Sequence, residues 1–161
     1  MGRKKKIPST PALRVLQAAK AEHTVATYPY VDRGGTAASS AALQVDEHIV
    51  VKTLVFETDA RQPLIICQHG DRSVSAKALA RVLGLRSVRP CDPQVAQRHT
   101  GYRVGGTSPF GTKKALPVYV EAGIFELDEI YINAGARGVL VRINPQLLRD
   151  LLQATAVQVS R

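Results

Sequence analysis

The stretch that decides the fold runs from Ile49 to Cys67 and reads IVVKTLVFETDARQPLIIC. Its first part, Ile49–Phe56, is rich in β-branched side chains and is predicted to be a strand, and Leu64–Cys67 is predicted to be a second strand. The polar residues Asp59–Pro63 between them are typical of a hairpin loop. We therefore expect a β-hairpin here, with the remaining elements arranged before and after it.

Further helices and strands are predicted on both sides of this hairpin. A polar residue followed by proline begins three predicted helices, at Thr10-Pro11, Asp92-Pro93 and Asn144-Pro145, because proline is well tolerated in a first helical turn. Strands outnumber helices and several are joined by short turns, which favours an α+β fold with a mixed or mostly antiparallel sheet and helices packed outside it. The other expected strands are 24–31, 87–89, 117–121, 129–133 and 139–143, and the other expected helices are 36–43 and 75–83.

The composition indicates one domain and a polyanionic partner. The 161 residues are 45% hydrophobic and carry a formal net charge of +9, which suits a single packed core and favours nucleic acid or an anionic membrane as partner. Aromatic residues make up only 5% of the chain, too few for a protein that reads many single-stranded bases by stacking. We expect one domain over 10–161 and a basic, disordered tail over 1–9 that includes Arg3–Lys6.

The sequence has no feature of a membrane or secreted protein. No apolar run approaches the ~20 residues of a membrane-spanning helix. The basic N-terminus leads into Ile7–Thr10 and not into the apolar core of a secretory signal. The two cysteines, Cys67 and Cys91, lack the spacing of a disulfide framework. We therefore expect a cytoplasmic protein with no membrane partner.

Lys52 is the most informative single residue. With a period of two, it lies on the strand face of Leu54 and Phe56, and the opposite face is also largely apolar. A lysine on a strand that is covered on both sides must meet an anion or line a pocket, because burying a lone ammonium is costly. The alternative is an edge-strand lysine whose ammonium reaches water. The local pattern leaves both interpretations open.

A glycine-rich segment, Gly105–Lys114, is the second candidate site. Its glycines have the separation of a phosphate-binding P-loop, but Thr112 precedes Lys113, the reverse of the order that motif requires. Pro109 also removes a backbone N–H from the loop. The functional interpretation is a rigid loop whose amides hold a carbonyl or phosphate oxygen, with Lys113 and Lys114 on a nucleic-acid backbone. A plain surface turn is the alternative.

Other catalytic arrangements are not indicated. Ser108 has no evident base in the sequence, although a partner distant along the chain is compatible with the pattern. A zinc site would show CxxC or HxxxH spacings, which are not found among Cys67, His69, Cys91 and His99. We expect neither a metal nor another cofactor.

Four segments resemble the YbaK/EbsC family of aminoacyl-tRNA deacylases. They are Val51–Leu54 (VKTL), Asp92–Pro109 (DPQVAQRHTGYRVGGTSP), Lys113–Pro117 (KKALP) and Ile130–Gly138 (IYINAGARG). Within the second, Gly105–Pro109 matches the GxxxP loop of that family. The likeness extends over most of the chain, and long matches in a fixed order are more specific than any single motif.

The resemblance implies a fold and an activity. The implied fold is α+β, with a curved, barrel-like mixed sheet. The implied activity is trans-editing hydrolysis of mischarged tRNA, either Cys-tRNA(Pro) or a tRNA carrying another small amino acid such as Ala. Mischarged tRNA is the implied partner, and prolyl-tRNA synthetase is a candidate second partner. A different class of function stays open, a non-catalytic tRNA- or RNA-binding or regulatory module on the same fold, because the basic charge fits both.

The resemblance also assigns residues. It implies that Lys52 lines the substrate pocket, that Tyr28 contacts the substrate, and that the GxxxP loop holds the aminoacyl carbonyl and the terminal adenosine. The expected catalytic residues are Lys52, Gly105 and Ser108; the expected substrate-binding residues are Tyr28, Gly101, Tyr102, Gly105, Gly106, Thr107, Ser108, Pro109, Ala134 and Gly135; the expected nucleic-acid-binding residues are Arg98, Lys113 and Lys114.

Two departures from the family pattern concern specificity. The Cys-tRNA(Pro) deacylases of this family carry an aspartate just after the position of the Arg137-Gly138 turn, where this chain has Leu140. The phenylalanine expected soon after Tyr28 has no clear counterpart. We therefore expect an activity profile unlike that of the Cys-tRNA(Pro) enzymes.

Overall fold

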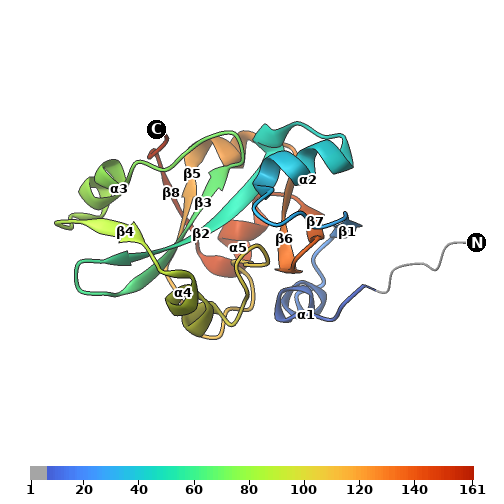
Figure 1. Ribbon diagram of the computed structural model, residues 1–161, viewed down its shortest axis with the longest axis horizontal. Helices are drawn as coiled ribbons and strands as arrows, with labels where there is room; N and C mark the ends of the chain where they lie inside the picture. Colours follow the sequence, from blue (N-terminus) through green and yellow to red (C-terminus); the bar gives the residue numbers. More distant parts are fainter. Residues whose placement is uncertain (1–6) are drawn as a thin grey trace, which may run out of the picture.

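The computed structural model describes residues 7–161, which form five α-helices, eight strands and two short 3₁₀ helices (Figure 1). Residues 1–6, and with them the Arg3–Lys6 run of the expected tail, lie outside the described residues. No helix in the described part is long and apolar enough to cross a membrane. In chain order the elements are α1 (Pro11–Ala18), β1 (Thr24–Thr27), α2 (Gly35–Leu43), η1 (Glu47–Ile49), β2 (Val50–Thr58), β3 (Pro63–His69), α3 (Ala76–Leu83), β4 (Val88–Pro90), α4 (Pro93–Thr100), β5 (Val118–Glu121), η2 (Ala122–Glu126), β6 (Ile130–Ala136), β7 (Val139–Ile143), α5 (Leu147–Leu152) and β8 (Thr155–Val157).

The eight described strands belong to one mixed sheet. Its order is β1-β7-β6-β2-β3-β5-β8, with β4 paired to β2 off this path. The β2–β3 pair is antiparallel, as expected of a hairpin, whereas the β2–β6, β3–β5 and β5–β8 pairs are parallel. The expected α+β fold with a mixed sheet is confirmed. The sheet stays open, because its path ends at β1 and β8 and does not close into a barrel.

The hairpin supplies the central strand of the sheet, and this strand is only partly covered on one edge. β2 pairs with β3 over Val51–Glu57. On its other edge it pairs with β6 at Val50–Val51 and with β4 at Phe56–Thr58. Figure 1 shows β4 toward the left end of the sheet and β6 toward the right. The edge of β2 over Lys52–Val55 therefore has no strand beside it.

The two faces of β2 pack into different hydrophobic clusters. Val51 and Val55 contact the larger cluster, to which α1 and α5 also contribute. Leu54 and Phe56 contact a second cluster, to which α3 and β4 contribute. The expected alternation is thus confirmed, and it puts Lys52 on the face of the second cluster, at the uncovered edge.

Helix ends follow the local chemistry of their cap residues. At the start of α1, the Leu13 amide donates to Thr10 Oγ1 at 3.0 Å, and Ser75 Oγ accepts an amide of the first turn of α3 at 3.1 Å. α4 begins after Asp92, as expected, but the Asp92 side chain makes no capping hydrogen bond. Its start is therefore defined by Pro93 and the backbone alone.

Three elements differ from the sequence expectation. β1 ends at Thr27 and not at residue 31, because Pro29 has no N–H to donate to the ladder. α5 begins at Leu147, later than the Asn144-Pro145 start. The sequence does not predict β8, because a strand of three residues is too short for its alternation to be recognised.

Candidate active site

A cavity of about 740 Å³ opens at the uncovered edge of β2. Residues Val50–Phe56 form one wall. The other walls come from segments that are distant in sequence: the chain after β1, the start of α2, the loop after α4 and the β6–β7 hairpin. A volume of this order is typical of a small-molecule site. The gap in the strand pairing of β2 therefore lies on the wall of this cavity.

Lys52 lines this cavity from the middle of β2. Its side chain is half-buried and forms no hydrogen bond or ion pair within residues 7–161. Burial lowers the pKa of the Lys52 ammonium, and the carboxylates of Glu47 and Asp71 act in the opposite direction. An unpaired, partly desolvated ammonium facing a cavity is an anchor for an anionic or carbonyl oxygen.

The backbone of β2 also faces the cavity. The Cys91 amide donates to the Val55 carbonyl at 2.9 Å, so Val55 directs its carbonyl away from β3. Because alternate residues of a strand point their backbone groups the same way, Thr53 directs its N–H and C=O to that same side. Thr53 lies between the pairings with β6 and β4 and lines the cavity. Its amide and carbonyl are therefore available to a polar group of a ligand.

The glycine-rich loop forms a further part of the cavity wall. Gly105 and Thr107 line the cavity, and Gly105 has a φ of +87° that a side chain would strain. A Cβ on Gly105 would lie 2.7 Å from Tyr30 Oη, and one on Gly106 would lie 3.0 Å from the Arg137 amide nitrogen. Glycine is therefore favoured at Gly105 by its backbone conformation and by the Tyr30 ring, and at Gly106 by the backbone of the β6–β7 turn.

Ser108 does not reach the cavity. Its side chain is completely buried, and its Oγ accepts a hydrogen bond from the Phe110 amide at 3.1 Å. This geometry stabilises the turn at the end of the loop. The expected catalytic role of Ser108 stays a prediction that the geometry does not support.

Several other expected substrate-binding residues support the loop from behind. The Tyr102 hydroxyl donates to the Phe110 carbonyl at 2.6 Å, and burial raises the pKa of that hydroxyl to about 12. Gly135 has no room for a Cβ, which would lie 2.8 Å from Tyr102 Cε1. Of the expected substrate-binding residues, Tyr28, Gly105 and Thr107 line the cavity, whereas Gly101, Tyr102, Gly106, Ser108, Pro109, Ala134 and Gly135 do not. The glycines Gly106 and Gly135 of this second group have close neighbours at the position of a Cβ, so the loop is closely packed there.

Tyr28 and Leu140 complete the wall near β1 and β7. Burial and the neighbouring Tyr30 raise the pKa of the Tyr28 hydroxyl, and a hydrogen bond with Ser39 acts in the opposite direction. Leu140 is 4% exposed and lines the cavity, whereas its neighbours Val139 and Val141 pack in the larger core cluster. The residue at the position of the family's aspartate therefore faces the cavity.

The expected nucleic-acid-binding residues gather outside the cavity, at the C-terminal end of α4. Lys114 Nζ lies 3.2 Å from His99 Nδ1, and the exposed Lys113 donates its amide to the Thr100 carbonyl at 2.9 Å. Arg98 lines a separate cavity of about 320 Å³ together with Glu57. Positive charge is favourable at this end of a helix even without a ligand. The position of these residues is therefore explained without nucleic acid, and their contact with it stays a prediction.

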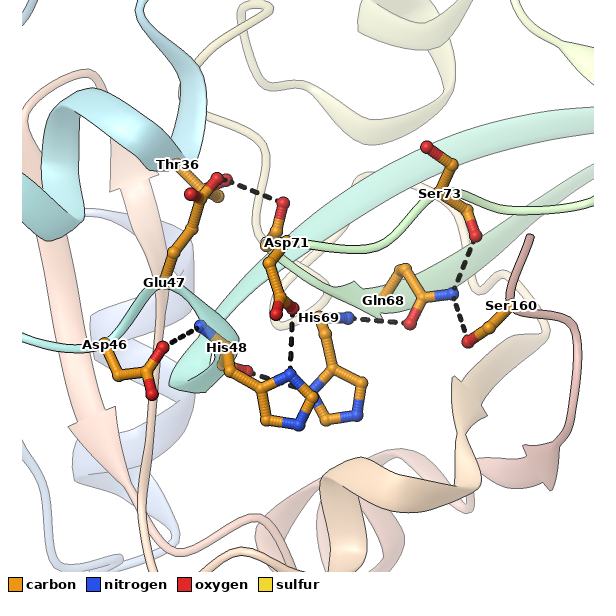
Figure 2. A network of polar contacts seen from close by, with 10 residues as sticks. Thr36, Asp46, Glu47, His48, Gln68, His69, Asp71, Ser73 and Ser160 are labelled. Carbon is orange, nitrogen blue, oxygen red and sulfur yellow. Dashed lines mark hydrogen bonds and ion pairs between the residues drawn. The ribbon is translucent and has the colours of Figure 1, made fainter.

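A polar network supports the cavity on the side of α2 (Figure 2). Thr36, which lines the cavity, donates to Glu47 Oε1 at 2.9 Å. Next to this pair, His48 Nδ1 lies 2.8 Å from Asp71 Oδ1, and the His48 ring stacks on the His69 ring with 3.8 Å between centroids. These contacts join α2, η1 and the end of β3 into one support.

The cavity wall includes one thiol, and this thiol is not activated. Cys91 lines it, but burial and the Glu57 carboxylate raise the pKa of the Cys91 thiol to about 11. A thiol with that pKa stays protonated near neutral pH and is a poor nucleophile. Across residues 7–161, no three His, Cys, Asp or Glu side chains converge as metal ligands do. The arrangement is suited to binding and polarising a carbonyl group that water or a group of the substrate attacks.

Sequence reasoning missed many of the residues that line the cavity. Tyr30, Asn133 and Arg137 are among them. Asn133 Nδ2 donates to the Gly105 carbonyl at 3.0 Å and fixes the loop. The signals were present in the Tyr-Pro-Tyr sequence at 28–30 and in the IYINAGARG segment, but neither shows which side chains reach the cavity.

The open mixed sheet, with a lysine at its uncovered edge and a glycine-rich loop lining the same cavity, agrees with the class of protein that the resemblance implies, an aminoacyl-tRNA editing domain. The family model described as "Aminoacyl-tRNA editing domain" matches residues 34–151, which is more than half of the chain. The chain belongs to this family. The expected family and enzyme class, an aminoacyl-tRNA deacylase, are therefore confirmed, and the non-catalytic alternative is not favoured.

Individual relatives agree with this assignment. EbsC of Enterococcus faecalis, described as a candidate Cys-tRNA(Pro)/Cys-tRNA(Cys) deacylase, is 26% identical over 161 residues, covering 99% of this chain and 98% of EbsC. A proline–tRNA ligase of Brachyspira hyodysenteriae is 26% identical over 74 residues, covering 46% of this chain and 13% of the ligase. The crystal structure of a candidate trans-editing enzyme for prolyl-tRNA synthetase has a TM-score of 0.82 at 22% identity, covering 96% of this chain and 99% of that one. This last match concerns the fold.

Proposed function

We propose that this protein is a trans-editing deacylase that hydrolyses the ester of tRNA(Pro) mischarged with a small amino acid, Cys or a relative such as Ala. The observation that carries the proposal is the cavity that Lys52 and Gly105 line together. The names of EbsC and of the trans-editing enzyme support the substrate class. The ligase segment supports prolyl-tRNA synthetase as a second partner. The free thiols Cys67 and Cys91 are consistent with a cytoplasmic protein.

In the proposed mechanism the site accelerates hydrolysis mainly by orientation and charge. The ester of an aminoacyl-tRNA is already activated, and holding it in one geometry supplies up to about 7–11 kcal/mol. The Lys52 ammonium and loop amides such as that of Gly105 stabilise the oxyanion as it forms, and one such donor contributes about 3–4 kcal/mol. Water is the nucleophile for most amino acids: it adds to the ester carbonyl and the ribose hydroxyl of the tRNA leaves. The thiol of a cysteinyl substrate can instead attack its own carbonyl, which breaks the same ester bond, releases the tRNA with its ribose hydroxyl and leaves cysteine as a cyclic thioester.

Editing of this kind is needed because binding alone discriminates poorly between amino acids of similar size. A small apolar pocket discriminates one methylene by only about 1–3 kcal/mol, so a synthetase for proline charges some smaller amino acids. The apolar wall that Leu140 adds to the cavity suits a small, uncharged side chain. A second site that accepts those amino acids and excludes proline restores the accuracy of charging.

A deacylation assay tests the proposal. A panel of tRNAs charged with labelled Cys, Ala, Ser or Pro is incubated with the protein, and release of the amino acid is followed. We expect release of one or two small amino acids from tRNA(Pro) and none of proline. Release no faster than the uncatalysed rate for every member of the panel would refute the proposal and favour the RNA-binding alternative.

A further inference from the structure

An aromatic ring and a guanidinium form a stacked pair on the wall of the cavity. The Arg137 guanidinium carbon lies 5.0 Å from the centroid of the Tyr30 ring, within the range of a cation–π contact. Both residues line the cavity. Tyr30 is half-buried and Arg137 is exposed, so the pair lies where the cavity opens to solvent.

The pair is held in place from several sides. Arg137 Nε donates to the Val104 carbonyl at 2.9 Å. The edge of the Tyr30 ring rests on Gly105, where a Cβ would lie only 2.7 Å from the hydroxyl oxygen. Gly138, beside Arg137 in the β6–β7 turn, accepts the Tyr28 amide at 2.9 Å. The ring orientation is therefore fixed before a ligand arrives, and it is fixed by the glycine-rich loop itself.

The neighbourhood of this pair has the character of a nucleobase site. Val104 lines the cavity and leaves 48% of its surface exposed, so it adds apolar surface to the opening. Arg33 lines the same opening and is exposed. Flat aromatic surface, exposed apolar surface and guanidinium groups are the features that hold unstacked bases of RNA.

A second arginine–aromatic pair in the chain serves as a comparison for the Tyr30–Arg137 pair. The Arg149 guanidinium lies 3.9 Å from the Phe125 ring centroid, but neither residue lines the cavity. Such a pair is ordinary surface packing. The Tyr30–Arg137 pair differs because it lies on the cavity wall and its ring is seated on the loop that faces Lys52.

We propose that Tyr30 and Arg137 form a stacking platform for the terminal nucleobase of the tRNA acceptor end. This inference rests on the proposed function, in which the loop holds the aminoacyl ester. The ester is attached to the ribose of the terminal nucleotide, so the base of that nucleotide must lie one sugar away from the loop. Tyr30 and Arg137 lie beside the loop at the opening of the cavity. Stacking recognises the face of the base, so it fixes the end of the tRNA without reading the sequence behind it.

The test uses an acceptor-stem RNA that ends in 2-aminopurine, a base whose fluorescence is quenched by stacking. The variants are Tyr30→Phe, Tyr30→Ala and Arg137→Ala, with Arg149→Ala as the matched control. We expect the wild type, Tyr30→Phe and Arg149→Ala to quench the fluorescence. Tyr30→Ala should abolish the quenching and weaken binding about 5- to 150-fold, the range for losing one stacked base. Arg137→Ala should reduce both effects to a lesser degree.

Two results would overturn the platform. The first is binding of the RNA by the wild-type protein without any change in 2-aminopurine fluorescence. The second is quenching that survives Tyr30→Ala while that variant changes which amino acid is released, since Tyr30 would then belong to the amino-acid pocket. Deacylation by the wild type is measured separately, so a failure of the proposed function is distinguishable from a failure of the platform. If Tyr30→Ala does not fold, Arg137→Ala decides the matter, because quenching and binding equal to those of the wild type in that variant would exclude the platform.

Discussion

Lys52 of β2 and Leu140 of β7 face one cavity, although β6 lies between their strands in the sheet. Lys52 supplies the cationic group of that cavity on the β2 side, and Leu140 supplies an apolar surface on the other. A site built in this way separates two tasks. The lysine acts on the ester, and the leucine shapes the space for the amino acid.

Replacing Lys52 should remove most of the activity and leave the fold intact. Lys52→Ala and Lys52→Met both delete an ammonium that has no partner within residues 7–161, so neither change leaves a buried carboxylate unpaired. We expect kcat/KM for deacylation to fall about 10²- to 10³-fold, as it does when one charge-stabilising group is lost. Thermal unfolding should be nearly unchanged. Lys77→Ala, on the exposed face of α3, is the control, and undiminished turnover in Lys52→Ala would exclude the assigned role.

A methyl group on Gly105 should damage the site more than the fold. Gly105→Ala places a Cβ 2.7 Å from the Tyr30 hydroxyl at a φ of +87°. Gly84→Ala is a matched control, because its φ is +67° and nothing lies within 4 Å of the added Cβ. Both variants should lose about 1–2 kcal/mol of stability from the left-handed backbone. Only Gly105→Ala should lose deacylation, measured as initial rates with the preferred substrate; equal activity of the two would show that the loop tolerates displacement.

The sequence predicts the hairpin, the alternation along β2 and all five helices from local signals, although α5 begins later than expected. It does not predict the gap on the β2 edge, because that gap depends on where β4 and β6 stop pairing, and strand pairing is not a local property. For the same reason it places Lys52 and Gly105 at the site but also includes Tyr102 and Gly135, which support the loop from beneath. Proximity along a motif does not separate a residue that touches the cavity from one that packs behind it.

Salt should weaken tRNA binding steeply if the basic end of α4 meets the phosphate backbone. Each phosphate contact releases counterions, so log K falls with log salt by about 0.7–0.9 per contact. The double change Lys113→Ala with Lys114→Ala should therefore reduce that slope by about one to two, measured by filter binding between ~50 and ~200 mM salt. Neutralising Lys77 and Arg81 of α3 removes the same charge elsewhere and should leave the slope nearly unchanged. An affinity that hardly depends on salt would contradict the prediction.

The His48–His69 stack predicts a loss of stability at mildly acidic pH. Burial lowers the pKa of His69 from its ordinary 6.5, while its hydrogen bond to the His48 carbonyl acts in the opposite direction. The unfolded chain therefore binds a proton at a pH where the folded protein does not. A depressed histidine pKa gives stability that is complete above pH ~6.5 and is lost as the pH falls below it.

His69→Phe keeps an aromatic ring beside His48 and removes the titration. Its free energy of unfolding should be flatter than that of the wild type between pH 7 and pH 5, in denaturant titrations at each pH. The paired Asp71 carboxyl, whose pKa lies below its ordinary 3.8, loses its contribution only at lower pH and so does not interfere in this window. The same slope in both proteins would place the pH dependence in another group.

Leu140 should set the amino-acid preference. It lies where the Cys-tRNA(Pro) deacylases of the family carry an aspartate, and it is buried in the cavity wall. Without that carboxylate, the α-ammonium of the substrate would cost several kcal/mol to bury unpaired. The Thr53 carbonyl, which faces the cavity from the uncovered edge of β2, is an acceptor for it in a changed pose. We therefore expect Ala-tRNA(Pro) to be hydrolysed at least as well as Cys-tRNA(Pro), as measured by kcat/KM for both.

Leu140→Asp then tests whether this one residue carries the difference. The variant should shift the ratio of kcat/KM toward Cys-tRNA(Pro) by about tenfold or more, the scale on which a single pocket contact discriminates. Leu140→Met keeps the volume and the apolar character, so its ratio should match that of the wild type. A shift of β7 by one residue would move the Leu140 side chain from the cavity to the core. The observed register excludes this shift, because Val139 and Val141 pack in the core and Leu140 lines the cavity. A strong and exclusive preference of the wild type for Cys-tRNA(Pro) would show that Leu140 does not set specificity. The α-ammonium of the substrate would then be bound by another group of the protein.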